Sequence, residues 1–196
     1  MVITGYQSSS NAVQISMNSH ERQWRGRIMV PDLFWIPGPW PGRLAISARP
    51  RGGDWLEDEA KSWRRAGIDL VVSLLENEEA SQLELLDERT RVEDSGIEFM
   101  SFPIRDRGVP DSTPEAISLL TRIVDALEAG KSVALHCRQG IGRSGLIAAG
   151  VLIVSGIAPQ EAIRMVTQAR GTPVPETTEQ ILWTQHLPSG LLLSRH

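Results

Sequence analysis

Residues 133–144 read VALHCRQGIGRS, and this stretch decides how the rest of the chain is interpreted. A short apolar run of the strand type leads into the protein's only cysteine, Cys137. A glycine-rich loop, Arg143 and a helix-like apolar segment follow. A cysteine at a strand-to-helix turn faces loop N–H groups and the positive end of the helix dipole, which favour the reactive thiolate. The order therefore predicts a thiolate nucleophile inside a cradle for phosphate oxygens.

The other residues of this stretch suit the same chemistry. The planar fork of Arg143 can hold two phosphate oxygens at once. The Ser144 hydroxyl could hydrogen-bond the sulfur and ease its later departure, and His136 could orient the loop from behind. The backbone between Cys137 and Arg143 is expected to bind the substrate phosphate; its residues are Arg138, Gln139, Gly140, Ile141 and Gly142.

The motif His136-Cys137-x5-Arg143-Ser144 resembles the signature of the protein tyrosine phosphatase superfamily. The short chain is most similar to its compact dual-specificity branch, in particular the cyclin-dependent-kinase-associated phosphatases. Low-molecular-weight phosphatases and arsenate reductases also use Cys-x5-Arg, but near the N-terminus, whereas Cys137 lies deep in the chain. The resemblance implies hydrolysis of phosphotyrosine and phosphoserine or phosphothreonine through a phosphocysteine, without a metal or cofactor. The alternative is a buried structural cysteine beside an ordinary glycine turn.

Members of this superfamily carry a general-acid aspartate on a loop before the cysteine. In this sequence Asp106, within residues 102–110, fits that loop about thirty residues before Cys137. An acid is needed because the leaving oxygen must take a proton as the P–O bond breaks. Asp111 is the rival candidate, although residues 111–114 are typical of a cap region at the start of a helix.

A glutamine-containing motif that helps place the hydrolytic water often follows the signature helix in this superfamily. Residues 175–180 resemble it, with Gln180 at the second glutamine and Glu176 in place of the first. A helix start with acidic residues in its first turn is an equally good interpretation.

The alternation of elements predicts an α/β fold with a central, mainly parallel β-sheet flanked by helices. Ligands in such sheets bind beyond the carboxyl ends of the strands. Arg49 and Arg51, after the first strand, would face that site or lie exposed, and Glu76, Glu78 and Glu79 are expected to belong to a solvated helix start. The predicted strands are 43–48, 69–75, 97–102 and 133–136. The predicted helices are 54–67, 77–88, 114–130, 144–155, 159–170 and 176–187. The segment 31–42 is expected to be irregular.

Composition agrees with a globular enzyme. The 196 residues suit one domain, expected at 26–196, after a polar N-terminal arm at 1–25. The net charge of −4 gives no reason to expect nucleic acid as a partner, and no apolar run is long enough for a membrane span. One cysteine excludes an internal disulfide and suits a reducing, cytoplasmic location. The expected partner is a phosphorylated protein or a small phosphate ester.

Two other classes of function stay open at this point. The same loop could serve non-protein substrates such as phosphoinositides, sugar phosphates or RNA 5′-phosphates. It could also bind phosphate without turnover, although Cys137, Arg143 and Asp106 together argue for catalysis.

Overall fold

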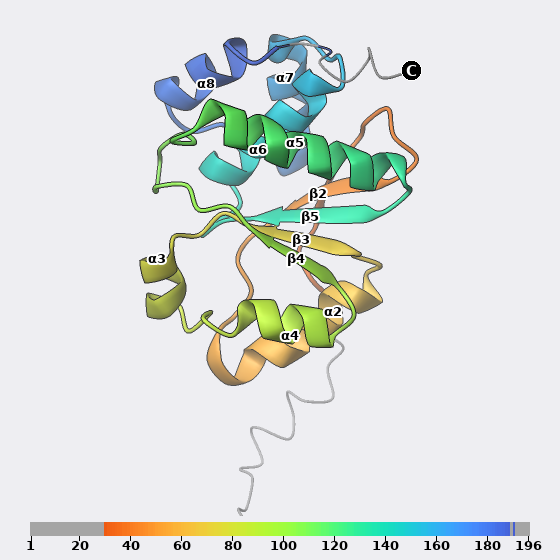
Figure 1. Cartoon of the computed structure of the whole chain (residues 1–196), viewed down its shortest axis with the longest axis vertical. Helices are drawn as coiled ribbons and strands as arrows, with labels where there is room; N and C mark the ends of the chain where they lie inside the picture. The colour runs from red at the N-terminus through yellow and green to blue at the C-terminus, as the bar shows by residue number, and fades with distance from the viewer. Residues whose placement is uncertain (1–29, 189, 191–196) are drawn as a thin grey trace, which may run out of the picture.

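The computed structural model describes residues 30–188 and 190. Its centre is a five-stranded sheet with the strand order β1-β2-β5-β3-β4 (Figure 1). All neighbouring strands are parallel except β1, which pairs antiparallel with β2. This confirms the predicted α/β class with a mainly parallel sheet. The strands are β1 (Phe34–Ile36), β2 (Arg43–Ser47), β3 (Leu70–Ser73), β4 (Glu98–Ser101) and β5 (Ser132–His136).

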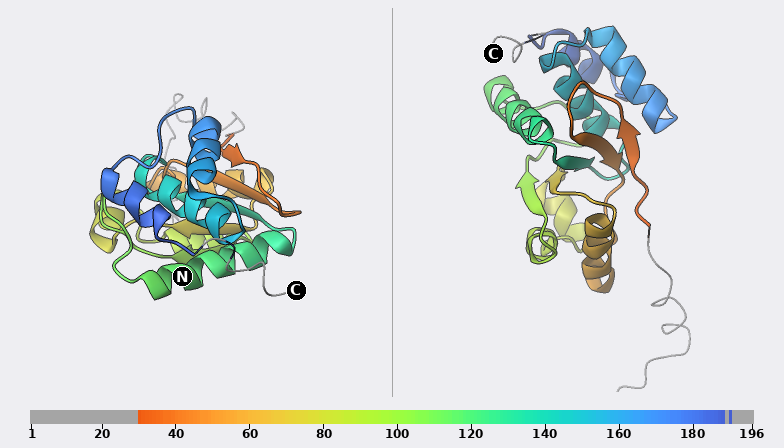
Figure 2. Two further views of the ribbon diagram at one scale, coloured as in Figure 1. Left: turned by 90° about the horizontal axis from the view of Figure 1, so that it is seen from above. Right: turned by 90° about the vertical axis from the view of Figure 1, so that its right-hand side faces the viewer.

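Helices cover both faces of the sheet (Figures 1 and 2). The larger layer lies above the sheet in Figure 1 and consists of α5 (Thr113–Glu128), α6 (Gly142–Val154), α7 (Pro159–Arg170) and α8 (Thr178–Gln185). The layer below consists of α2 (Leu56–Arg65) and α4 (Glu88–Asp94). The short helix α3 (Asn77–Gln82) follows β3 and lies beyond the carboxyl end of that strand.

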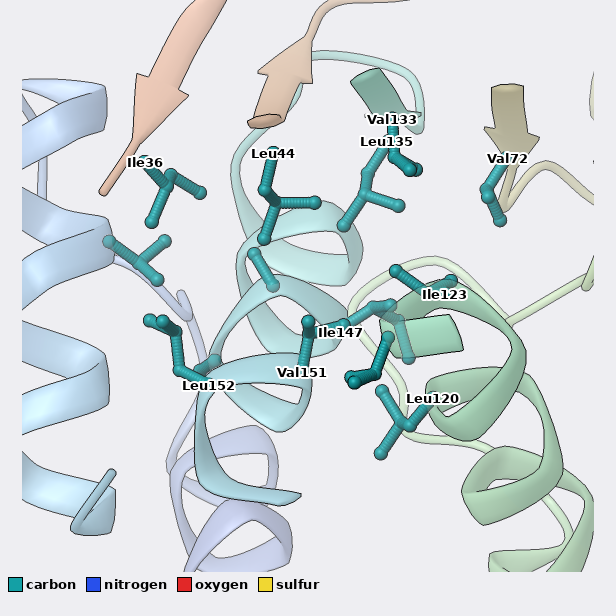
Figure 3. Packing of buried hydrophobic residues seen from close by; sticks show 14 of the residues in the cluster. Ile36, Leu44, Val72, Leu120, Ile123, Val133, Leu135, Ile147, Val151 and Leu152 are labelled. Carbon is teal, nitrogen blue, oxygen red and sulfur yellow. The ribbon is translucent and has the colours of Figure 1, made fainter. Parts of the chain in front are cut away.

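Helix α6 forms the middle of the main core (Figure 3). Every residue of α6 is buried, because the sheet covers one side of the helix while α5, α7 and α8 cover the others. Ile147 and Val151 of α6 belong to the same cluster as Leu44 and Leu135 of the sheet. A helix that is apolar all round is stable only in such a position. Its first turn is therefore held rigidly against the carboxyl end of β5.

The strands alternate between the two layers, as a period of two requires. Val133 and Leu135 of β5 face the large cluster with α6, whereas Ala134 faces the smaller cluster with α2 and α4. Trp63 of α2 and Val92 of α4 complete that smaller cluster. His136, the next residue of β5 after Leu135, consequently points toward α2 and α4.

The structure corrects three local predictions. Residues 31–42 contain the strand β1, which pairs with the edge of the sheet. The predicted helix 77–88 ends early, at Gln82, and Glu84 adopts a positive φ of 56° after it. A further helix that was not predicted, α4, begins at Glu88. Helix α2 begins at Leu56, after a 3-10 turn at Gly53–Trp55, and not at Asp54.

The other predicted elements agree with the structure to within a few residues. The arm expected at 1–25 lies outside the described residues. Within the described part of the chain, no helix combines the length and the apolar character that crossing a membrane requires.

Candidate active site

The loop between β5 and α6 brings Cys137 to the start of a buried helix. Gly140 has a φ of +65°, and a Cβ there would lie 2.5 Å from the carbonyl oxygen of Ser47, so the close turn requires glycine. Helix α6 begins at Gly142, with Ile141 as its N-cap. The N–H groups of a first helical turn have no intrahelical acceptors. They provide the expected anion-binding cradle next to the sulfur.

The site favours the thiolate form of Cys137. Its side chain is only 3% exposed, and burial alone would raise the pKa of the thiol. Hydrogen bonds from the Ser144 hydroxyl and from backbone groups of Ser144 and Ile141, together with the charge of Arg143, outweigh burial and lower that pKa below its ordinary value. These surroundings are of the kind that a nucleophilic cysteine needs.

Arg143 is a buried cation with several fixed partners. Its side chain is 2% exposed, and Nη1 donates to the carbonyl oxygen of Ile104 at 3.0 Å. Both carboxylate oxygens of Glu79 accept from it, Oε2 from Nη1 at 2.5 Å and Oε1 from Nη2 at 3.0 Å. Its buried Nε has no partner among the described residues. The guanidinium is thus held in one orientation and keeps a donor for a bound oxyanion.

The two candidate acids lie in different surroundings. The carboxylate of Asp106 lies 3.1 Å from Nη2 of Arg143, and Asp106 lines the pocket that contains Cys137. Asp111 is 82% exposed and pairs with Arg105 at 3.4 Å. The N-cap of α5 is Ser112, whose hydroxyl accepts from the backbone N–H of Glu115. Geometry therefore favours Asp106 over Asp111 as the acid, and Asp111 is not the capping side chain.

The loop that carries Asp106 is fastened to the segment before α8. Nη1 of Arg107 pairs with Oε1 of Glu176 at 3.0 Å. Gln180 is fully buried; its amide nitrogen donates to the carbonyl oxygen of Gly108 at 2.9 Å, and its amide oxygen accepts from the backbone N–H of Glu176 at 3.1 Å. Gln180 thus joins two loops. Of the two residues of the predicted glutamine-type motif, only Glu176 lines the pocket.

The pocket around the cysteine has a volume of about 200 Å³. Three arginines and two carboxylates surround the sulfur, so the pocket is strongly polar. Gly140, predicted to bind substrate, packs against the backbone of Ser47 and is not part of the lining. Within residues 30–188 and 190, no three His, Cys, Asp or Glu side chains gather in a way that could hold a metal ion. The lining residues are Asp106, Arg107, Cys137, Arg138, Gln139, Ile141, Gly142, Arg143 and Glu176.

His136 and Ser144 flank the loop, at the end of β5 and in the first turn of α6. Both side chains are fully buried. Oε1 of Glu88, at the start of α4, lies 2.9 Å from Nε2 of His136. Burial by itself lowers the pKa of His136, but the charge and hydrogen bonding of Glu88 and the neighbouring Cys137 raise it above its ordinary value.

Three further residues support the site and were not identified from the sequence. Glu79 was expected to be solvated, yet it is the bidentate partner of Arg143. Glu88 pairs with His136. Arg170 of α7 donates to the carbonyl oxygens of Gly140 at 2.7 Å and Gln139 at 3.1 Å. Of the three, only Glu79 could have been suspected from the sequence, because it follows β3, whose carboxyl end lies at the same edge of the sheet as that of β5.

Arg49 and Arg51 do not line the cysteine pocket. Arg49 donates to the carbonyl oxygen of Pro50, and Arg51 pairs with Glu59 at 2.6 Å. Both line a separate hollow of about 270 Å³ beside Trp63. The interpretation as loop arginines therefore fits better than direct contact with the substrate phosphate.

Comparison with known proteins supports the class that the fold and the site define, the cysteine phosphatases. A family model described as "Polymorphic toxin system, DSP-PTPase phosphatase" matches residues 47–157, more than half of the chain. The chain belongs to this phosphatase family. The structure of Tk-PTP in its active form has a TM-score of 0.65 and 31% identity, covering 80% of this chain and 97% of that one.

Two other similar proteins agree. A structure of kinase associated phosphatase, with its catalytic-site cysteine substituted by serine, has a TM-score of 0.74 at 20% identity and covers 81% of this chain and 94% of that one; it shows the fold alone. "Putative tyrosine phosphatase 197R" of Invertebrate iridescent virus 6 is 26% identical over 159 residues, which are 79% of this chain. The chain spans 56% of the length of that viral protein.

Proposed function

We propose that this chain is a cysteine-dependent phosphatase that hydrolyses phosphate monoesters on proteins, at both phosphotyrosine and phosphoserine or phosphothreonine. The observation that carries the proposal is the convergence of Cys137, Arg143 and Asp106 on one pocket. Asp106 lies 3.1 Å from the guanidinium, and the thiol pKa is lowered. A nucleophile, an oxyanion clamp and an acid are the three groups that a cysteine uses to cleave a phosphate ester.

In the first step, the Cys137 thiolate attacks phosphorus from the side opposite the leaving oxygen. The S–P bond forms as the P–O bond breaks, which gives a phosphocysteine and an alcohol or phenol. Arg143 and the first-turn N–H groups of α6 bind the phosphoryl oxygens and stabilise their charge in the transition state. Asp106, in its protonated form, gives its proton to the leaving oxygen.

In the second step, water attacks the phosphocysteine. The Asp106 carboxylate takes a proton from the water, a new P–O bond forms, and the S–P bond breaks to release inorganic phosphate. The sulfur leaves as a thiolate, which the Ser144 hydroxyl and the loop N–H groups stabilise. We include Glu176 as a candidate for positioning this water, because it lines the pocket.

The choice of protein substrates rests on the similar proteins, whose names describe a tyrosine phosphatase and a kinase associated phosphatase.

The chemistry also requires Cys137 to remain a reduced thiol, so we propose that the protein acts in a reducing compartment such as the cytoplasm.

The decisive experiment is a substrate panel with the full chain. Turnover of an aryl phosphate tests catalysis itself, and phosphopeptides carrying tyrosine, serine or threonine phosphate, together with phosphoinositide vesicles, test the substrate class. Cys137→Ser is the control, because serine nearly preserves the volume but is a much weaker nucleophile. We expect activity on aryl phosphate and on the phosphopeptides, and none in the control. Activity on phosphoinositides alone would overturn the substrate class, and undiminished activity in Cys137→Ser would overturn the mechanism.

A further inference from the structure

A buried ion pair lies directly behind the candidate nucleophile. Glu88 is the first residue of α4, and its carboxylate Oε1 lies 2.9 Å from Nε2 of His136. The side chains of Glu88 and His136 are 4% and 0% exposed. His136 is the residue immediately before Cys137, so any change in its charge acts at short range on the sulfur.

The surroundings of this pair are mostly apolar. The ring of Trp63 on α2 lies 5.8 Å from the ring of His136, and β3 and β2 place the buried hydroxyls of Ser73 and Ser47 beside it in register. The titratable groups that act on His136 are Glu88 on one side and Cys137 on the other. A carboxylate in such surroundings is costly unless a cation pairs with it.

A charged imidazole offsets the negative charge of both neighbours, although its ring nitrogens make no aligned hydrogen bond to them. As an imidazolium, His136 compensates the Glu88 carboxylate and also presents a positive charge to the sulfur. As a neutral ring, it would leave the buried Glu88 carboxylate without its ion-pair partner, and the sulfur would keep only the charge of Arg143 beside it. The raised pKa of His136, which burial opposes and Glu88 and Cys137 cause, agrees with the charged form.

We propose that Glu88 is a positioning residue of this active site, whose buried carboxylate holds His136 as an imidazolium behind Cys137 and so keeps the sulfur ionised. The inference rests on the proposed function only in taking Cys137 as the nucleophile. Glu88 touches no substrate, and it acts on Cys137 through His136. Because the link runs through buried groups, solvent and salt screen it weakly.

The test uses the fact that Cys137 is the only cysteine in the chain. The rate at which iodoacetamide alkylates the full chain, measured against pH, gives the thiol pKa of Cys137 without any substrate. An opposite charge at short range shifts a pKa by roughly 1–3 units, and the effect here passes through one intervening ring, so Glu88→Gln should raise the thiol pKa by about one unit. Well below that pKa, alkylation should then be about ten-fold slower.

A matched control separates this effect from a general loss of charge or stability. Glu93→Gln makes the same chemical change on the same helix, but Glu93 is exposed and pairs with Arg89 on the surface. It should leave the alkylation profile unchanged. If Glu88→Gln lowers the unfolding temperature but leaves the thiol pKa unchanged, Glu88 is a structural residue and the proposal is wrong.

A second measurement covers the case in which Glu88→Gln does not fold. Replacing His20, His186 and His196 by glutamine leaves His136 as the only histidine, and nuclear magnetic resonance then reports its charge alone. We expect the imidazolium to persist above the ordinary pKa of histidine, about 6.5. A neutral ring at pH 7 would overturn the proposal. Neither measurement involves a phosphate ester, so both remain readable even if the proposed phosphatase activity is absent.

Discussion

Replacing Glu79 with glutamine should destabilise the protein and misalign Arg143. The carboxylate makes two hydrogen bonds to the guanidinium, at 2.5 and 3.0 Å, and its side chain is only 12% exposed. Removing one partner of a buried pair costs about 3–5 kcal/mol. In this site Asp106 and the carbonyl oxygens of Leu74 and Ile104 remain as partners, and glutamine can still accept one hydrogen bond. We therefore expect a loss of about 2 kcal/mol in the free energy of unfolding.

Urea unfolding at pH 7 measures that loss directly, and turnover of an aryl phosphate measures the effect on the site. A guanidinium fixed less firmly should lower kcat/KM by about ten-fold, because oxyanion stabilisation depends on donor geometry. The pH dependence gives a further check. Burial opposes ionisation of Glu79, but the hydrogen bond and charge of Arg143 prevail and lower its pKa below 4.5. The stability that ionised Glu79 contributes is therefore complete above pH 4.5 and is lost as the pH falls through the lower, folded-state pKa.

The matched control is Glu78→Gln, since Glu78 is the exposed neighbour on the same helix. It should change the free energy of unfolding by less than about 0.5 kcal/mol and leave the rate unchanged. Equal stability and equal kcat/KM in Glu79→Gln and Glu78→Gln would refute the reasoning. A stability difference between wild type and Glu79→Gln that grows as the pH falls would refute the assigned charge state.

Three further predictions concern the catalytic groups. Asp106→Ala should slow hydrolysis of phosphopeptides by ~10²–10⁴-fold and hydrolysis of an activated aryl ester much less, because poor leaving groups need the proton most. Asp111→Ala should leave both rates unchanged, and a steeper dependence on the leaving group in Asp111→Ala would reverse the assignment. Arg143→Lys keeps the charge but loses the fork, so turnover should fall by ~10²-fold or more, and near-normal turnover would remove Arg143 as the clamp. Peroxide should inactivate the enzyme by oxidising Cys137, and bound vanadate should slow the inactivation. If peroxide inactivates the enzyme no faster than it oxidises an ordinary exposed thiol, the lowered pKa of Cys137 is contradicted.

Much of the fold could be predicted from local sequence patterns. Helix α7 has the predicted bounds, and α5 begins and ends near Pro114 and Gly130, because proline and glycine act through the backbone of their own turn. The interior strands are apolar runs that a parallel sheet requires. The strand β1 was missed because a three-residue segment among prolines and tryptophans has no readable period. The break at Glu84 was missed because a non-glycine residue with positive φ has no sequence signal here.

The sequence by itself determined the loop. The order of Cys137, the glycines, Arg143 and Ser144 specifies a strand-to-helix turn with an anion cradle, because the backbone preferences and N–H groups that form such a turn belong to residues close together in the chain. Only the tertiary structure decided the partners of that loop. Glu79, Glu88 and Arg170 reach it from α3, α4 and α7 and support Arg143, His136 and the loop carbonyls. In the sequence these residues look like ordinary surface charges. Their burial and pairing depend on which helix ends the sheet brings together, and local propensity carries no information about that packing.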